Sequence, residues 1–551
     1  MAGIYLSTLI STHLPQLTKV FRRNMLKLKK SALALTVSTL LLSNIPNAAA
    51  ADIVYMEPVA AGVSLTDIAT AGDFAGGSYL IGGIPDGMGV IKKGNILRIL
   101  TNHEWSNANS IAAARPSVGG LTSASYVSEM HYDLTSKKIV AGKDFMQYMD
   151  WFDYNTLEHT YEPTAPKGAA GVDSYGSLNH GRALNRFCSA TLAPAGTFFD
   201  KKSGFGYEGA VYLTGEEGGD ESRGFAFNQD GDGAQIPRFG LSAWETFVPA
   251  PNTGKSTVVF GNEDGSSTDS QLWMYKGSKQ KGGTWFENAG FTNGSLYVLA
   301  TDVANDNEFR AKYGKNKAAP ISFKSIDWKV NGAIQNAQAR SGMTLARVED
   351  GHFDPKKPND YYFVTTESNK DPKATAPNPE TPTVSRDGGA LWRLSLKDVN
   401  DPLKGGTLTL LLDGSEAPYL SKPDNISVDD LGNILIQEDP GNNAALARVV
   451  AYRISDGKLA TVATFKSEYF TEGGQNFITR DEESSGIIDV TQYLKTRASD
   501  KAKYYMLVAQ VHATPAKSRP DLPADRFDLA KAVEGGQWYV MKVNSWAGIY
   551  S

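Results

Sequence analysis

The feature that most constrains the fold of this 551-residue chain is a long succession of short strand-like segments after residue 52. Each segment is apolar or alternating, is rich in β-branched and aromatic residues, and ends at Gly, Asn or Asp. The clearest are residues 208–213, 256–260, 271–275, 295–300, 361–366, 390–396, 407–412, 433–437, 449–454, 504–510 and 538–543. Because helical periodicity between them is scarce, the pattern predicts an all-β fold, with one six-bladed β-propeller favoured over a pair of sandwiches.

Loops and short helical insertions are expected between the strands. The best helical segment is 333–347, within a stretch from 276 to 347 that we interpret as an insertion, and 371–383 is expected to be a surface loop. The sequence shows no exact repeat period. A composition of 41% hydrophobic and 10% aromatic residues is that of a globular protein with a large core. We therefore expect residues 52–551 to form a single domain.

Residues 1–51 have the order of segments found in an export signal. Arg22-Arg23 and Lys27 precede an apolar stretch at 31–45, and small residues at 47–51 offer cleavage sites. The apolar stretch of about 15 residues is shorter than the roughly 20 that a membrane-spanning helix needs, so no permanent membrane anchor is expected. Paired arginines fit the twin-arginine route and a start at Met25 fits the general secretory route, and both stay open. A periplasmic or secreted protein is expected.

The charge and the cysteine count exclude several classes of protein. Residues 1–50 hold six basic residues and no acid, so 49 basic against 60 acidic residues remain, a net charge of −11. Nucleic acid is therefore not an expected partner. A single Cys excludes an intramolecular disulfide framework and a Cys-x-x-Cys zinc site. We also expect a monomer.

Acidic clusters recur at the ends of the predicted strands, next to Gly or Pro. They lie at residues 102–105, 215–218, 262–265, 347–351, 423–425, 437–442 and 481–485. An acidic pair beside a turn is usually a solvated loop. Seven such clusters at strand ends are better explained by metal binding, because carboxylates that converge on one face need cations.

The candidate metal ligands are the acids of these clusters together with the lone cysteine. They are Cys188, Glu104, Glu216, Glu217, Glu263, Asp264, Glu349, Asp350, Asp424, Glu438, Asp439 and Glu482. Clusters rich in oxygen suit Ca²⁺, which takes six to eight oxygen ligands, whereas a thiolate suits a transition metal such as iron.

Three further features have competing interpretations. Cys188 could be an inert buried thiol, a nucleophile or a metal ligand. His103 could be a ligand, a base or a structural residue. The segment from Asn228 to Gly233 looks like the start of a calcium loop, but Phe239 stands where such a loop needs a bidentate Glu.

The sequence contains no Gly-x-Ser-x-Gly, no His-Glu-x-x-His and no nucleotide-binding fingerprint, so serine-hydrolase, zincin and dinucleotide chemistry have no support.

Taken in order, these motifs resemble the PhoX-type alkaline phosphatase family, which are exported bacterial enzymes with a six-bladed propeller and a calcium and iron active site. The resemblance is carried by Asn102-His103-Glu104, Cys188, Glu216-Glu217, residues 258–264, residues 347–351 with 353–355, and residues 438–442. More typical members surround the cysteine with Gly and follow it closely with a Trp-Gly-Thr-Trp run. Here Ser189 and Ala190 follow Cys188, and a longer insert separates Cys188 from Glu216. These two departures are typical of a divergent branch of the family.

The resemblance implies that Cys188 and carboxylates such as Glu217, Glu263 and Glu349 ligate Fe³⁺ and Ca²⁺, and that Arg347 holds the substrate phosphate. We therefore expect metal-dependent hydrolysis of phosphate monoesters, with Arg347, Cys188 and His103 as the catalytic residues. One alternative is a propeller hydrolase of phosphodiesters, phytate or lactones. Another is a calcium-stabilised extracellular propeller that binds a partner and catalyses nothing.

Overall fold

The computed structural model describes residues 53–106, 125–154, 161–163, 184–497, 499–523, 525–526 and 528–550. All of them belong to the segment Asp52–Ser551, which separates from Met1–Ala51. The predicted export signal therefore lies outside the described residues. Within the described ranges, no helix has both the length and the apolar character needed to cross a membrane.

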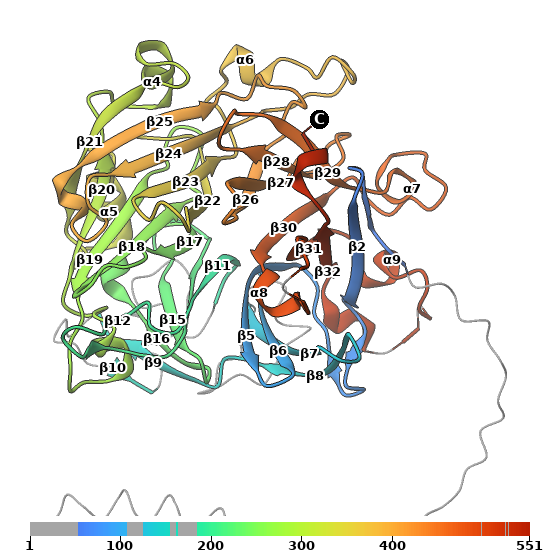
Figure 1. Ribbon diagram of the computed structural model, residues 1–551, viewed down its shortest axis with the longest axis horizontal. Coiled ribbons are helices and arrows are strands. Elements are labelled where there is room, and N and C mark those ends of the chain that lie inside the picture. The colour runs from blue at the N-terminus through green and yellow to red at the C-terminus, as the bar shows by residue number, and fades with distance from the viewer. Residues whose placement is uncertain are drawn as a thin grey trace, which may run out of the picture. The chain divides into compact units, whose positions relative to one another are not determined.

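The described chain is mostly β, as the sequence predicts, and its strands join into two large and two smaller sheets (Figure 1). The ten-stranded sheet contains β5 (Pro85–Lys93), β6 (Ile96–His103), β7 (Tyr126–Asp133), β8 (Lys138–Asp144), β9 (Tyr148–Phe152), β10 (Tyr161–Glu162), β11 (Phe187–Ala193), β14 (Val211–Glu216), β15 (Gly224–Asn228) and β16 (Asp232–Gln235). The nine-stranded sheet contains β17 (Trp244–Pro249), β18 (Ser256–Glu263), β19 (Leu272–Ser278), β20 (Ser295–Ala300), β21 (Ala318–Ile326), β22 (Val348–Phe353), β23 (Asp360–Thr365), β24 (Ala390–Leu396) and β25 (Gly406–Leu412).

The two smaller sheets consist mainly of strands from the last third of the chain, and each also takes one strand from the start of the described residues. The five-stranded sheet contains β1 (Met56–Pro58), β26 (Pro423–Val428), β27 (Asn433–Glu438), β28 (Arg448–Arg453) and β29 (Leu459–Phe465). The four-stranded sheet contains β2 (Val63–Thr70), β30 (Glu482–Asp489), β31 (Lys503–Val511) and β32 (Gly535–Val543). Two short pairs complete the set, β3 (Phe74–Ala75) with β4 (Tyr79–Leu80) and β12 (Phe199–Asp200) with β13 (Phe205–Gly206). Every strand-like segment named from the sequence overlaps one of these strands.

The helices are short and lie between strands. They are α3 (Trp285–Asn288), α4 (Asp306–Lys312), α5 (Gly332–Ala339), α6 (Pro372–Thr375), α7 (Ser467–Phe470), α8 (Thr491–Leu494) and α9 (Pro515–Ser518). Single 3₁₀ turns occur at η2 (Pro237–Phe239), η3 (Pro402–Lys404), η4 (Leu529–Ala532) and η5 (Trp546–Gly548).

Two local expectations are corrected by the structure. The predicted helix at 333–347 ends at Ala339, because the chain beyond Gly342 pairs with other segments: Leu345 N donates to Ser270 O, and Arg347 has a left-handed φ of 58°. The stretch 276–347 is not an insertion, since β20 and β21 continue the sheet from β19.

Antiparallel neighbours group the strands into six runs within the described residues. They are β5–β8, β11 with β14–β16, β17–β20, β22–β25, β26–β29, and β30–β32 closed by β2. The last run joins both ends of the described chain, because Val63 of β2 pairs with Val543 of β32. The first strands of the runs contact one another in turn, from β5 through β11, β17, β22, β26 and β30 back to β5. In Figure 1 these six strands lie toward the middle, whereas β8 and β21 lie at the periphery.

The core lies between neighbouring runs, where hydrophobic faces meet. Trp244 of β17 and Trp273 of β19 pack with Leu213 of β14 in one cluster, and the two indole rings are 5.4 Å apart. Phe260 of β18 packs on Tyr361 of β23 with ring centroids 5.1 Å apart. Aromatic pairs of this kind bury large areas, so each run is fixed against the next.

Buried amides tie the second strand of one run to the first strand of the next. Asn102 Nδ2 donates to Cys188 O at 2.8 Å, and Gln437 Nε2 donates to Ser485 O at 3.0 Å. Asn262 Nδ2 makes the same kind of bond to Glu349 O. Because a buried amide without partners is costly, these bonds hold the inner strands in one position.

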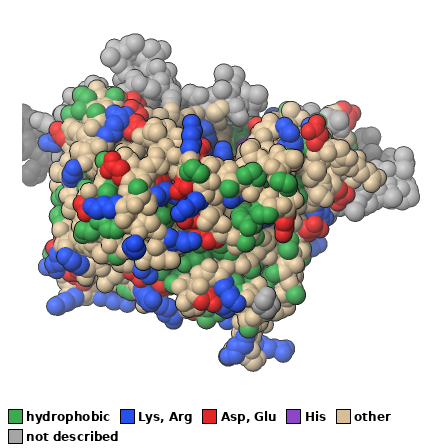
Figure 2. Space-filling view, turned by 90° about the horizontal axis from the view of Figure 1, so that it is seen from above, with side chains coloured by type: hydrophobic (Ala, Val, Ile, Leu, Met, Phe, Trp, Pro, Cys, Tyr) green, Lys and Arg blue, Asp and Glu red, His purple; other side chains and the backbone are tan. Residues whose placement is uncertain are grey.

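The surface and the interior of this acidic chain differ in how charge is arranged. Figure 2 shows a face on which Lys and Arg are interspersed with Asp and Glu and with small groups of hydrophobic side chains. The interior also contains acidic residues. Five of them, Asp86, Glu217, Glu245, Glu349 and Asp424, are buried.

Candidate metal centre

The six runs share one backbone hydrogen bond, which joins the start of the first strand to the end of the second. In each run a backbone carbonyl just before the first strand accepts from the backbone N–H of the residue that directly follows the second strand. The pairs, acceptor first, are Ile84 and Glu104, Arg186 and Glu217, Ala243 and Asp264, Arg347 and Thr366, Lys422 and Asp439, and Asp481 and His512. Two residues beyond each acceptor lies a central side chain; in run order these are Asp86, Cys188, Glu245, Glu349, Asp424 and Glu483.

Five of these first strands are irregular where the central residue lies. The pairing register shifts between Pro85 and Met88, Phe187 and Ala190, Trp244 and Thr246, Val348 and Gly351, and Pro423 and Ile426. A β-bulge leaves a residue outside the ladder and redirects its side chain. The bulges therefore release Asp86, Cys188, Glu245, Glu349 and Asp424 from regular alternation and allow them to converge.

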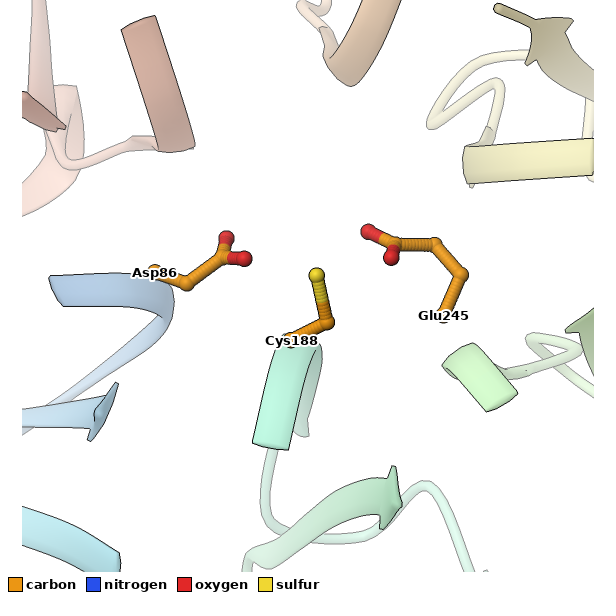
Figure 3. Close-up of side chains that lie close together, drawn as sticks. All are labelled: Asp86, Cys188 and Glu245. Atoms are coloured by element: carbon orange, nitrogen blue, oxygen red, sulfur yellow. The ribbon is translucent and has the colours of Figure 1, made fainter. Parts of the chain in front are cut away.

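Three groups of ligand atoms result, and in each group the atoms lie within 4.8 Å of one another. They are Asp86 with Cys188 and Glu245, Glu104 with Cys188 and Glu217, and Glu245 with Glu349 and Asp424. Figure 3 shows the first group, in which side chains from β5, β11 and β17 point toward one another. Cys188 and Glu245 each belong to two groups, so the three groups form one connected centre.

Burial and mutual repulsion disfavour negative charge at this centre. Burial, followed by the charge of Glu104, raises the pKa of Asp86 to about 7. Burial, followed by the charge of Glu349, raises the pKa of Glu245 well above its usual range. Burial and the nearby acids, Asp86 first, likewise raise the pKa of the Cys188 thiol. Cations bound among these groups would remove the repulsion and favour the ionised forms.

Several oxygens of the centre lack the partners that buried oxygens normally have. Asp86 Oδ2, Glu245 Oε1 and Asp424 Oδ1 are buried and accept no hydrogen bond from an N–H or O–H group in the part of the chain that the structure describes. Leaving a buried acceptor unsatisfied costs about 1–3 kcal/mol. Carboxylate oxygens with free lone pairs beside a thiol are a donor set that fits hard cations and a transition metal.

Four predicted ligands lie outside this centre because protein groups bind their carboxylates. Glu216 pairs with Arg223 (2.8 Å) and Glu438 with Arg448 (2.6 Å). Glu263 accepts from Trp273 Nε1 at 2.8 Å, and Glu482 accepts from Ala447 N at 3.1 Å. Successive residues of a strand point to opposite sides, so in each acidic pair one member faces the protein and its neighbour faces the centre.

The neighbours of these residues, and Asp350, take intermediate positions. Glu217, Asp264 and Asp439 directly follow the second strands of their runs, and of the three Glu217 belongs to one of the groups of ligand atoms. Asp350 accepts from the N–H groups of Gly351 (2.7 Å) and Ile426 (3.2 Å), which uses both of its oxygens. Burial raises the pKa of Asp350 to about 7.

The structure places His103 apart from the three groups, in a structural position. The ring is fully buried, its Nδ1 lies 2.9 Å from Gly83 O, and its Nε2 lies 2.8 Å from Ser128 Oγ. It stacks on Tyr126 with ring centroids 4.3 Å apart. Both ring nitrogens are engaged, so the predicted catalytic role of His103 is replaced by one in packing.

The segment that looks like a calcium loop is a closed turn. Asn228 Oδ1 accepts from the backbone N–H groups of Asp230 (2.9 Å) and Asp232 (3.1 Å), so the first oxygen of the motif is engaged within the loop.

Two arginines lie at the centre, one of them predicted. Arg347 donates from Nε and Nη2 to Asp264 at 2.8 and 2.7 Å, and its Nη2 lies 3.3 Å from Glu349 Oε1. Arg186 donates from Nε to Glu104 at 2.9 Å, and its Nη2 lies 2.9 Å from Glu217 Oε2. Arg186 precedes Cys188 by two residues, as Arg347 precedes Glu349.

Sequence reasoning missed Asp86, Glu245 and Arg186, and in the predicted cluster 481–485 it selected Glu482 rather than Glu483. Asp86 carried a usable signal, because Pro85-Asp86-Gly87 has the form of Pro423-Asp424-Asn425. Glu245 carried none, since it follows Trp244 within an apolar strand without Gly or Pro beside it.

Comparison with known proteins agrees with this architecture. Residues 234–490 match the family model described as alkaline phosphatase PhoX. The structure of Pseudomonas fluorescens PhoX in complex with vanadate, a transition state analogue, is similar with a TM-score of 0.58 at 13% identity, over 91% of this chain and 97% of that chain. No curated protein sequence matches the chain.

Two other solved structures are less similar. A luciferin-regenerating enzyme has a TM-score of 0.32 at 10% identity, over 88% of this chain and 95% of that chain. The calcium structure of a Trichoderma reesei carbohydrate-active enzyme of family AA12 has a TM-score of 0.29 at 11% identity, over 75% of this chain and 98% of that chain.

Proposed function

Because the chain resembles the PhoX alkaline phosphatase family, we propose that it is an exported metal-dependent phosphatase that hydrolyses phosphate monoesters. The observation that carries the proposal is the connected centre of Asp86, Cys188, Glu245, Glu349 and Asp424, whose buried oxygens lack partners and which lies beside two arginines. The similar PhoX structure contains vanadate as a transition state analogue, which is consistent with phosphoryl chemistry on this fold.

The scaffold in this proposal is a six-bladed β-propeller. Six runs of antiparallel strands, the closed series of contacts among their first strands, and the hydrogen bond repeated in every run support it. In such a propeller the inner strands surround a central channel, which is where the acids of this chain converge.

The donor sets favour different metals at different positions. Cys188, with Asp86, Glu104, Glu217 and Glu245, offers a thiolate and carboxylates and fits iron. Glu245, Glu349 and Asp424 offer oxygen only and fit calcium. When bound, these ions would supply positive charge to a phosphate ester and acidify water in a buried site.

The chain's own residues bind and orient the ester. The Nε and Nη2 of Arg347 are held by Asp264, whereas its Nη1 lies 3.9 Å from Glu367 Oε1, beyond hydrogen-bond distance, and can donate to a phosphate oxygen. The low-dielectric surroundings of the centre strengthen this contact. Burial and surrounding acids raise the pKa of Cys188, so the metal-free thiol is a poor nucleophile, whereas a cation bound among these acids would favour the thiolate as its ligand.

Export is proposed from residues 1–51, whose basic, apolar and small-residue segments have the order of a signal peptide. An exported enzyme of this kind would meet its phosphate esters in the periplasm or outside the cell.

The proposal is tested by hydrolysis of p-nitrophenyl phosphate before and after calcium chelation. We expect the wild-type protein to hydrolyse the ester, chelation to abolish this turnover, and added calcium to restore it. Arg347→Gln should lower the turnover rate at least tenfold. Arg340→Gln is the matched control, because Arg340 forms an exposed ion pair with Asp269, which belongs to none of the three groups of ligand atoms. A metal-loaded protein without turnover would refute the phosphatase and favour a calcium-stabilised binding propeller.

A further inference from the structure

Arg186 occupies in the second run the position that Arg347 occupies in the fourth. Each residue stands two positions before a central side chain, Cys188 and Glu349 respectively, and its carbonyl accepts the hydrogen bond that recurs in every run. Both have left-handed backbones, with φ of 48° for Arg186 and 58° for Arg347. Ile84 and Lys422 have the same conformation at the equivalent position, with φ of 49° and 47°, so the left-handed backbone belongs to the repeated turn and the arginine side chain is what the second and fourth runs share.

The two guanidinium groups are also held alike. Each uses Nε and Nη2 on carboxylates that come from two different runs, Glu104 and Glu217 for Arg186, and Asp264 and Glu349 for Arg347. The described hydrogen bonds of Arg186 come from Nε and Nη2, and Nη1 of Arg347 lies 3.9 Å from Glu367 Oε1, beyond hydrogen-bond distance. Each arginine therefore keeps one pair of donors available for an anion.

The two arginines belong to one network. Glu217 pairs with Arg186 and lies close enough to Asp264 for the charge of Asp264 to disfavour its ionised form, and Asp264 in turn pairs with Arg347. The side chains of Arg186 and Arg347 are 46% and 25% exposed, whereas the acids that hold them are at most 8% exposed. The two arginine side chains are thus more accessible than the acids that hold them.

We propose that Arg186 is a second substrate-binding residue, which together with Arg347 holds the phosphate group of the ester between two fixed guanidinium groups. This inference rests on the proposed function and extends it from one phosphate-binding arginine to two. The carboxylates Glu104 and Glu217 orient Arg186, as Asp264 orients Arg347. A dianionic phosphate offers oxygens to both arginines, whereas a neutral lactone offers no such charge.

The experiment compares Arg186→Gln, Arg186→Lys and Arg340→Gln with the wild-type protein. For each metal-loaded protein we would measure KM and kcat for p-nitrophenyl phosphate, the affinity for inorganic phosphate by calorimetry, the metal content and the melting temperature. Arg186→Gln should raise KM and weaken phosphate binding about 10- to 100-fold, with metal content unchanged. Arg186→Lys should recover part of the loss, because it keeps the charge and loses the planar donors, and Arg340→Gln should match the wild type.

The outcomes separate this inference from the proposed function. Unchanged KM and phosphate affinity in Arg186→Gln, in an active protein, would overturn the role of Arg186 and leave the phosphatase standing. A loss of affinity that follows loss of metal would also overturn it and make Arg186 a structural partner of Glu104 and Glu217. A wild-type protein that binds phosphate through Arg186 without turnover would support the arginine pair and refute the phosphatase.

Discussion

Glu263 provides a quantitative test of how the centre is built. Its carboxylate is buried, accepts from Trp273 Nε1 at 2.8 Å and from Gln271 N at 2.9 Å, and lies outside the three candidate metal groups. Burial raises its pKa from the usual 4.5 to about 8. The folded protein therefore favours the neutral acid, which Glu263→Gln imitates in shape and in hydrogen-bonding capacity.

The direction of the pH effect follows from the raised pKa. A folded pKa above the unfolded value stabilises the fold at pH below about 4.5, and this contribution is lost as pH rises through about 8. A shift of roughly three and a half units corresponds to about 4–5 kcal/mol between those limits. Between pH 5 and pH 9 the metal-free wild type should therefore lose about that much free energy of unfolding through Glu263, whereas the Glu263→Gln protein should not. The variant should be more stable than the wild type at pH 9.

Guanidinium unfolding of the metal-free proteins at pH 5, 7 and 9 measures this effect. Glu57→Gln, at an exposed strand position, is the control and should keep the wild-type pH profile. If Glu263→Gln showed the same pH slope as the wild type, the assignment of Glu263 as a buried neutral acid would be wrong. If it instead lost metal, Glu263 would be a ligand, as the family resemblance implies.

Three further predictions follow from the same contacts. Glu245→Gln should lower the content of both iron and calcium, measured by elemental analysis, because Glu245 is shared by two groups, and loss of neither metal would contradict that sharing. Asn262→Ala should lower the free energy of unfolding by about 1–3 kcal/mol, because it leaves Glu349 O and Tyr361 without a buried partner; an unchanged unfolding midpoint would refute the proposed tie between runs. Arg98 and His131 lower the pKa of the buried Glu129 to about 2, so Glu129→Gln should destabilise the protein at pH 7 by roughly 3 kcal/mol, and the difference should shrink as pH falls from 4.5 toward 2; a constant difference across that range would contradict it.

The strands were predictable because their signal is local. Alternating β-branched and aromatic residues closed by turn residues are read within a few positions, and segments such as 390–396 and 433–437 coincide closely with β24 and β27. The helix expected at 333–347 ends at Ala339. The residues after it are not helical because Leu345 bonds to Ser270 of another strand connection and Arg347 has a left-handed backbone, and both are tertiary effects.

The convergence of acids at strand ends could also be predicted, but not their individual roles. In Glu216-Glu217 and Glu438-Asp439 the sequence shows two adjacent acids, and only the positions of Arg223 and Arg448 decide which one is bound by the protein. Glu245 joins the centre through a bulge in β17, a feature without a mark in the sequence. The repeated hydrogen bond likewise relates runs whose residues at equivalent positions differ in chemistry, which explains why no sequence repeat is visible.

Elemental analysis of the purified protein decides whether Asp86, Cys188, Glu245, Glu349 and Asp424 form one metal centre. We expect stoichiometric iron and calcium in the wild type, with iron lost in Cys188→Ala and calcium reduced in Asp424→Asn. Glu216→Gln should keep both metals, because Glu216 is bound by Arg223. A wild-type protein without stoichiometric metal, or equal metal content in all four proteins, would contradict the claim.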